Sequence, residues 1–297
     1  VNEISIIEDL IGHHGEPFGD SSIIPTWNVC KLAREHVPMV LSGDGGDELF
    51  GGYLSHSNWI KYSPKNYIKN QFSDKNYYLG IRGVLGYSKK AIKYKTTNFL
   101  DEWFSRFSYS DLETRKKIWK KEYHYILDNK IIIFEKSHNK GKKYQRLDYA
   151  QYMDIKTNLP GHILSKVDTA SMYHGLEVRT PIIDKNILTL ASVIPLNQKY
   201  NFESKNSPGK YNLKKLLAKD FDNQFVFRKK QGFSIPKYKW FYKEGYGYKL
   251  LNLYCQESTN LLNSIFETKY IHEILKIHSQ KKADFSNLLW LLTMIGV

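Results

Sequence analysis

A glycine-rich acidic turn after a short apolar run constrains the fold of this chain more than any other feature. The run 37–41 is apolar and has the composition of a β-strand, and the residues after it, 42–53, read Ser-Gly-Asp-Gly-Gly-Asp-Glu-Leu-Phe-Gly-Gly-Tyr. Glycine lets backbone N–H groups approach a ligand closely, and Asp44 and Asp47 are spaced so that both carboxylates could reach one cation. Open α/β sheets bind ligands where a strand ends in such a turn. The segment predicts a nucleotide and magnesium site, with a plain tight turn as the alternative.

The segments around this turn predict an α/β fold that becomes mostly α-helical. Residues 26–35 carry apolar side chains at the spacing of a buried helix, so helix, strand and turn follow one another as in a parallel sheet. Beyond the turn, aromatic and apolar residues recur at helical intervals. We expect one domain with three segments: an α/β portion over residues 1–60, an irregular helical insertion over 61–150 and a helical remainder over 151–297.

The helical remainder contains specific start and stop signals. A helix that begins near residue 147 should end at Pro160-Gly161, because proline removes a backbone donor and glycine weakens a helix. Asp184 is a candidate N-cap for a helix that runs to Val193. Further helical patterns cover residues 211–220, 237–255 and 267–295.

The composition is that of a globular chain. It is 41% hydrophobic over 297 residues, and no apolar run reaches the ~20 residues needed to cross a bilayer. The first residues lack a signal-peptide pattern, so we expect a cytoplasmic protein. The chain begins with Val rather than Met, which suggests a fragment. Cys30 and Cys255 lie far apart without a Cys-x-x-Cys spacing, and they predict buried thiols.

The net charge of +14 raises the question of nucleic-acid binding. Basic residues cluster only moderately, and no zinc-finger, helix-turn-helix or RNP pattern accompanies them. Lys, Asn, Ile and Tyr are abundant together, which indicates a bias of composition. A basic nucleic-acid binder is therefore a remote alternative.

Two further stretches could carry chemistry. The basic stretch 227–236 places Lys230 two residues before a glycine, where its ammonium could reach a phosphate chain, although the same residues would suit a solvated loop. The stretch 166–184 holds charged residues that could order a loop through an internal ion-pair network, a structural role that spacing alone favours. The residues of that network are Asp168, Glu177, Arg179 and Asp184.

Together these stretches resemble the synthetase domain of the class B, glutamine-hydrolysing asparagine synthetase family. Members carry the motifs Glu-Pro-Phe-x-Asp-Ser-Ser, Ser-Gly-[Asp/Glu]-Gly-x-Asp-Glu-x-Phe-Gly-Gly-Tyr, Ser-Met-x-x-x-Leu-Glu-x-Arg-x-Pro-x-x-Asp and Lys-x-Gly-Phe-x-x-Pro. This chain has them in the same order, at residues 16–22, 42–53, 171–184 and 230–236. Four motifs in the family's order are hard to obtain by chance.

The resemblance implies a Rossmann-like synthetase fold of the pyrophosphate-loop (PP-loop) type, present only in part. Residues 1–60 would be the C-terminal slice of its nucleotide-binding sheet. It also implies ATP and Mg²⁺ as cofactors and adenylation of the β-carboxylate of aspartate, after which ammonia displaces AMP. By the resemblance, Ser42 and Gly43 line the nucleotide site and Asp47 holds magnesium.

The resemblance also implies catalytic roles for three residues. Asp44 takes the acidic position linked to forming the acyl-adenylate and to handling the protons of ammonia. Lys230 would neutralise the departing pyrophosphate, a role suited to a flexible point charge. Arg179 would form a supporting salt bridge near the site.

The resemblance covers nearly the whole chain but only the later part of the family's architecture. The sequence contains neither the family's Ser-Gly-Gly-x-Asp-Ser pyrophosphate loop nor its glutaminase domain, whose N-terminal cysteine releases ammonia from glutamine. We therefore expect a fragment, or a chain completed by an upstream glutaminase and PP-loop segment, that binds ATP poorly alone. The implied partners are aspartate, ATP and ammonia from glutamine. We expect no specific nucleic-acid or membrane partner, and a homodimer is possible.

Relatives with these motifs leave other functions open. β-Lactam synthetases, lasso-peptide cyclases and enzymes that amidate sugar acids in surface-polysaccharide pathways share them. Asparagine synthesis remains the leading hypothesis because the acidic third position of the turn is Asp44. A non-catalytic remnant or binding module, which would keep the fold without turnover, is the alternative from another class.

Overall fold

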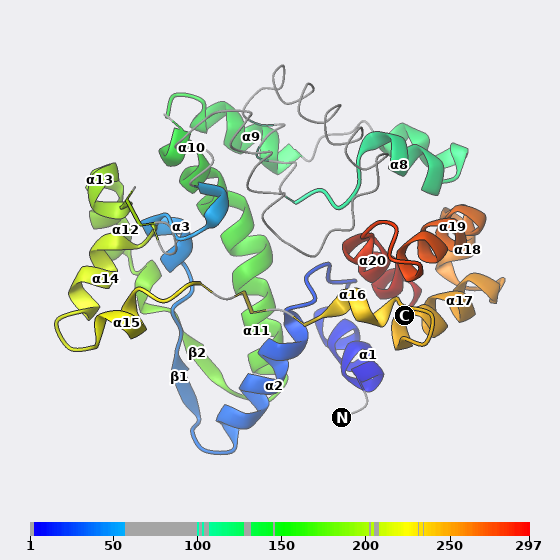
Figure 1. Ribbon diagram of the computed structural model, residues 1–297, viewed down its shortest axis with the longest axis horizontal. Helices are drawn as coiled ribbons and strands as arrows, with labels where there is room; N and C mark the ends of the chain where they lie inside the picture. The colour runs from blue at the N-terminus through cyan, green and yellow to red at the C-terminus, as the bar shows by residue number, and fades with distance from the viewer. Residues whose placement is uncertain are drawn as a thin grey trace. The chain divides into compact units, whose positions relative to one another are not determined.

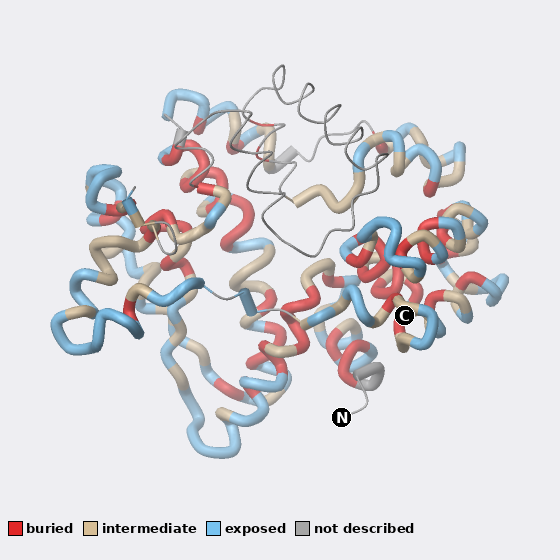
Figure 2. The backbone as a smooth tube through the Cα atoms, viewed as in Figure 1, coloured by how far each residue is buried: buried red, intermediate tan, exposed pale blue. Residues whose placement is uncertain are grey.

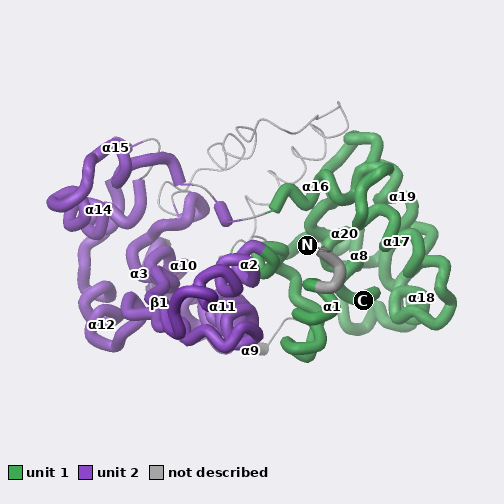
Figure 3. The backbone as a smooth tube through the Cα atoms, turned by 90° about the horizontal axis from the view of Figure 1, so that it is seen from below, with its two compact units in different colours: residues 1–24, 67–131, 234–297 green, residues 25–66, 132–233 purple. Residues whose placement is uncertain are grey.

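The computed structural model divides the chain into two compact units, which Figure 3 colours separately. Unit 1 contains residues 1–24, 67–131 and 234–297, and unit 2 contains residues 25–66 and 132–233. The expected segment boundaries near residues 60 and 150 stay a prediction, and much of the expected insertion lies outside the described residues. The structure describes residues 3–56, 100, 103, 107–127, 132–144, 146–201, 203–204, 208–230, 232–233 and 235–297.

Unit 2 contains a small parallel sheet that confirms an α/β element. Strand β1 (Met39–Leu41) pairs in parallel with β2 (Glu177–Arg179), and Leu41 lies opposite Arg179. Helix α2 (Ile23–Arg34) precedes β1, as the sequence predicted for residues 26–35, and the two strands lie side by side in Figure 1. The register brings the end of β1, where the glycine-rich turn begins, next to the end of β2.

The rest of unit 2 is helical. Its described elements are α3 (Gly46–Phe50), α9 (Ile132–Gly141), α10 (Arg146–Met153), the π-helix η2 (Asp154–Leu164), α11 (Ser165–Met172), the 3-10 helix η3 (Pro181–Ile183), α12 (Lys185–Val193), α13 (Leu196–Lys199), α14 (Tyr211–Leu217) and α15 (Asn223–Val226). The Asp184 carboxylate accepts a hydrogen bond of 2.8 Å from the backbone N–H of Asn186. This confirms the predicted N-cap of a helix that ends at Val193.

The predicted helix stop at Pro160-Gly161 is wrong. Elements α10, η2 and α11 follow one another without a break, with Pro160 inside the π-helical portion. In an α-helix the proline ring would clash with the carbonyl four residues earlier, and the wider turn of a π-helix leaves room for that ring. The helix ends only at Met172, and the turn after it reaches Gly175, whose φ of 65° is left-handed and whose N–H donates to the Met172 carbonyl.

Unit 1 is an all-helical assembly in its described part. Its elements are α1 (Glu3–His14), α8 (Leu112–Ile118), the 3-10 helix η1 (Lys121–Ile126), α16 (Lys237–Trp240), α17 (Tyr246–Gln256), α18 (Leu261–Ile265), α19 (Thr268–Ser279) and α20 (Ser286–Gly296). Two predicted helical stretches are therefore each split, at residues 241–245 and 280–285.

The core of unit 1 lies where α17 packs against α18, α19 and α20. Leu251, Leu262, Ile271 and Trp290 are completely buried there, and Figure 2 shows the buried stretch of α20 in red. Cys255 is buried in α17 and Cys30 in α2, both as free thiols, which confirms that prediction. Among the described residues, no helix is both long and apolar enough to cross a membrane.

Candidate functional site

The glycine-rich turn is built on the end of the sheet. The Ser42 N–H donates a hydrogen bond of 2.8 Å to the carbonyl of Arg179, so β2 holds the first residue after β1. Gly45 then adopts a φ of 85°, and a Cβ there would lie 2.1 Å from a methyl carbon of Ile183. Only glycine satisfies both the left-handed backbone and this close approach. The turn leads into α3, which ends at Phe50 and is capped by Gly51, again with positive φ.

Ser42, Gly43 and Asp44 lie together at the start of the turn, as the sequence predicted. The Ser42 hydroxyl donates a short hydrogen bond to the Asp44 carboxylate, and the Asp44 N–H lies 3.2 Å from the same hydroxyl oxygen. A Cβ built on Gly43 would meet nothing within 4 Å, so space is open beside its backbone. These groups could present a hydroxyl, a carboxylate and an approachable backbone to one ligand.

Asp47 lies between two lysine side chains that come from distant parts of unit 2. The Lys230 Nζ is 2.7 Å from one carboxylate oxygen and the Lys210 Nζ is 3.2 Å from the other. Burial by itself raises the pKa of the Asp47 carboxyl, but the charges and hydrogen bonds of the two lysines together hold that pKa below its usual value. The structure thus joins the predicted Asp47 and Lys230 and adds Lys210.

Lys210 was missed by sequence reasoning, which treated the stretch from residue 211 only as a helix. A Cβ on Gly209 would lie 2.0 Å from the Gly51 carbonyl oxygen, so this glycine allows the loop to approach the glycine-rich turn closely. The Lys210 N–H donates to the Phe50 carbonyl at 3.0 Å. The available signal was the Gly-Lys pair itself, since a lysine after a glycine can be held close to a backbone turn.

Lys214, one helical turn further along α14, extends the positive charge. Its Nζ donates to the Gly209 carbonyl, which ties the helix to the loop that carries Lys210. Burial, followed by the charge of Lys210, lowers the pKa of Lys214 to about 8. Figure 1 shows α3 beside α12, with α14 close by, and the apolar side of α3 packs on α12 through Leu49, Phe50 and Ala191.

A buried polar layer lies under the turn. Glu48 is only 1% exposed and accepts a short hydrogen bond from the Tyr53 hydroxyl, while the Lys230 Nζ lies 4.8 Å from the centre of the Tyr53 ring. Burial raises the pKa of Glu48. The Gln151 side chain donates to the Glu48 carbonyl at 2.6 Å and accepts from Lys199 at 3.1 Å. The layer therefore fixes Tyr53, and Tyr53 lies against the Lys230 ammonium.

His56 and Asp154 complete this layer with a completely buried pair. The His56 Nε2 lies 2.7 Å from an Asp154 carboxylate oxygen, and both side chains are 0% exposed. The His56 ring also contacts Tyr53 edge to face, with ring centres 5.2 Å apart. The pair joins η2 to the residues that follow the glycine-rich turn.

Arg179 supports the site through its backbone. Its guanidinium pairs with Glu177 at 2.8 Å, and both side chains are mostly exposed, at 63% and 57%. The four-residue ion-pair network that we considered does not form among the described residues, because Asp184 instead caps α12 and Asp168 lines a hollow. The hydrogen bond from Ser42 to the Arg179 carbonyl is the contact that reaches the turn.

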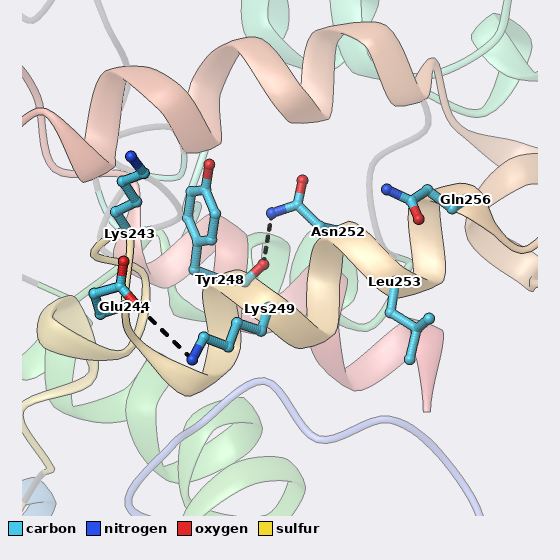
Figure 4. A pocket seen from close by; sticks show the side chains of 7 residues that line it. All are labelled: Lys243, Glu244, Tyr248, Lys249, Asn252, Leu253 and Gln256. Atoms are coloured by element: carbon cyan, nitrogen blue, oxygen red, sulfur yellow. Dashed lines mark hydrogen bonds and ion pairs between the residues drawn. The ribbon is translucent and has the colours of Figure 1, made fainter.

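Two hollows of the described surface are lined by residues outside the glycine-rich turn. One of about 470 Å³ is bounded by α11 and β2 and includes Asp168 and Glu177. The other, of about 430 Å³, runs along α17, where Figure 4 shows Lys249 pointing toward Glu244 at 3.9 Å. Neither hollow is lined by a residue of the turn, where Asp47 meets two lysines, so we place the candidate site at the turn.

The residues of the turn fit a magnesium polyphosphate by their donor types. Two lysines on one carboxylate leave an excess of positive charge, which suits phosphate oxygens. Magnesium takes one or two carboxylates together with phosphate oxygens and water, so Asp47 alone could be enough. In the described part of the chain, no group of three or more His, Cys, Asp or Glu residues could hold a metal ion.

Comparison with known proteins places the chain in a family. The family model described as asparagine synthase matches residues 2–296. The chain belongs to the asparagine synthase family. It is 28% identical over 288 residues to asparagine synthetase [glutamine-hydrolyzing] 1 of Bacillus subtilis, an alignment that covers 95% of this chain and 43% of the relative.

Two further relatives bear related names. A putative asparagine synthetase [glutamine-hydrolyzing] of Mycobacterium bovis is 25% identical over 297 residues, which cover 97% of this chain and 43% of the relative. A putative asparagine synthetase [glutamine-hydrolyzing] 2 of Methanocaldococcus jannaschii is 35% identical over 177 residues, 56% of this chain and 32% of the relative. The chain thus spans less than half the length of these family members.

Proposed function

We propose that this chain is the synthetase part of a glutamine-dependent asparagine synthase, a carbon–nitrogen ligase that forms AMP. ATP would adenylate the β-carboxylate of aspartate and release pyrophosphate, and ammonia would attack the activated carbonyl carbon and release AMP. The observation that carries the proposal is the Asp47 carboxylate between Lys210 and Lys230 on a glycine-rich turn. Family membership over residues 2–296 supports it.

The chain's own residues would divide the work at this turn. Ser42 and Gly43 would line the nucleotide, because their backbone follows β1 and lies at an open surface. Lys230 would neutralise the pyrophosphate as it leaves, held over the Tyr53 ring. Asp44, held by the Ser42 hydroxyl, would accept a proton from the attacking ammonia.

Asp47 would hold the magnesium ion, and that ion would neutralise charge on the phosphate oxygens. Arg179 would order the start of the turn through its carbonyl, with the exposed ion pair to Glu177 in a minor role. Another part of the whole enzyme would supply the pyrophosphate loop, the remaining strands of the PP-loop sheet and the glutaminase. Among the described residues the sheet has two strands, which supports that expectation, because parallel sheets are ordinarily larger and covered on both faces.

The test is pyrophosphate release by the whole enzyme from ATP, aspartate and magnesium. We expect Asp47→Asn to lower the rate about a hundredfold or more, since a neutral amide is a poor magnesium ligand. Lys230→Ala should slow the same step with less effect on ATP affinity. Asp220→Asn, an exposed aspartate after α14, is the matched control and should keep the rate. An unchanged rate in Asp47→Asn would contradict the magnesium role.

A further inference from the structure

The roles assigned so far leave out Lys210, the second lysine at Asp47. Lys230 alone would neutralise the single charge of Asp47, yet Lys210 approaches the other carboxylate oxygen at 3.2 Å. The side chains of Lys210, Lys230 and Asp47 are 29%, 39% and 23% exposed, so a ligand from solvent can reach all three. The three groups together carry a net positive charge at an accessible surface.

The surrounding structure holds Lys210 in an unfavourable backbone conformation. Its φ of 56° is left-handed, a region that favours glycine and asparagine and costs a lysine some free energy. The loop is fixed there by the hydrogen bond of Lys210 to Phe50 and by the close approach of Gly209 to Gly51. A strained residue that the surrounding structure keeps in place often serves a ligand site.

We propose that Lys210 binds the diphosphate group at this turn together with Lys230, and that Asp47 occupies both ammonium groups until the ligand arrives. A diphosphate offers several charged oxygens, so it can accept hydrogen bonds from both lysines, whereas Asp47 offers only two oxygens and one charge. The ligand therefore replaces Asp47 as their partner, and the carboxylate becomes available to a cation. The identity of the ligand rests on the proposed function, whereas the pairing of the two lysines does not.

The exchange predicts opposite effects of one substitution in two conditions. Without magnesium, Asp47 only competes with the diphosphate for the lysines, so Asp47→Asn should strengthen pyrophosphate binding by about three- to tenfold. With magnesium, Asp47 would bind the ion that the pyrophosphate carries, so the same substitution should weaken binding. A carboxylate with a purely structural role would not reverse its effect in this way.

The experiment is calorimetric titration of the whole enzyme with pyrophosphate, with and without magnesium, at about 150 mM salt to screen the bulk charge. Lys210→Met and Lys230→Met should each weaken magnesium-free binding about tenfold, since each loses a charge-assisted hydrogen bond. Lys215→Met removes the same charge from the exposed side of α14 and should bind as the unaltered chain does. Lys210→Gly removes the ammonium while relieving the left-handed backbone, which guards against misfolding.

The outcomes separate this inference from the proposed function. If Lys210→Met and Lys210→Gly bind like Lys215→Met while Lys230→Met is weakened, the role of Lys210 is wrong and the proposed function stands. If Asp47→Asn weakens binding in both conditions, the exchange is wrong. If the unaltered whole enzyme shows no saturable pyrophosphate binding, both the inference and the diphosphate site of the proposed function are contradicted.

Discussion

The two sides of the glycine-rich turn differ in what their charged groups do. Asp47 and Glu48 are neighbours, and because successive side chains of a helix point about 100° apart, α3 sends them in different directions. Asp47 faces two partly exposed lysines that a ligand could claim, whereas Glu48 is buried against the Tyr53 hydroxyl. The outer side, which carries Asp47, is arranged for exchange of partners. The inner side, which carries Glu48, is arranged to hold one geometry.

Among the substitutions that test this comparison, breaking the buried pair of His56 and Asp154 should have the largest effect. We expect His56→Ala to lower the free energy of unfolding by about 3–5 kcal/mol, because it leaves the Asp154 carboxylate buried without the ring nitrogen at 2.7 Å. Urea unfolding followed by circular dichroism measures the loss. His36→Ala, at an exposed position, is the control and should change stability little. Equal stability of the two variants would show that the inner layer is not structural.

Substitution of Tyr53 should separate its two contacts. Tyr53→Phe removes the hydroxyl that donates to Glu48 but keeps the ring beneath Lys230, so we expect a loss of about 1–3 kcal/mol in stability with pyrophosphate affinity retained. Tyr53→Leu also removes the ring, so it should weaken pyrophosphate binding as well, by about two- to fivefold. Unfolding curves and calorimetric titration of both variants measure these effects. Equal affinities would indicate that Tyr53 does not position Lys230.

The smallest effect concerns the pH dependence of stability at the outer side. The pKa of Lys214 is lowered to about 8 in the folded chain from an ordinary 10.5, so between these values the unfolded chain binds more protons. Stability contributed by this group therefore rises with pH from about 8 to 10.5. Lys214→Met should flatten that rise in the melting temperature relative to Lys215→Met, which loses the same charge. Parallel pH profiles of the two variants would exclude this role for Lys214.

The fold was predictable where the signal is local. The apolar run before the turn became β1, and Asp184 caps the helix that the sequence placed after it, since both depend on neighbouring residues. Pro160 was misread because the usual rule assumes an α-helix, whereas the chain forms a π-helix there. The split of residues 237–255 was also missed: a Cβ on Gly245 would lie 2.3 Å from the Trp240 carbonyl oxygen, a contact that periodicity does not reveal.

The sequence by itself determined the family and half of the candidate site. The order and spacing of its motifs named Ser42, Gly43, Asp44, Asp47 and Lys230 without coordinates. Only the tertiary structure decided that Lys210 shares Asp47 with Lys230 and that Glu48 turns inward to Tyr53. The reason is physical: a motif records which residues are close along the chain, whereas a charge cluster depends on packing that brings residues 47, 210 and 230 within the reach of one carboxylate.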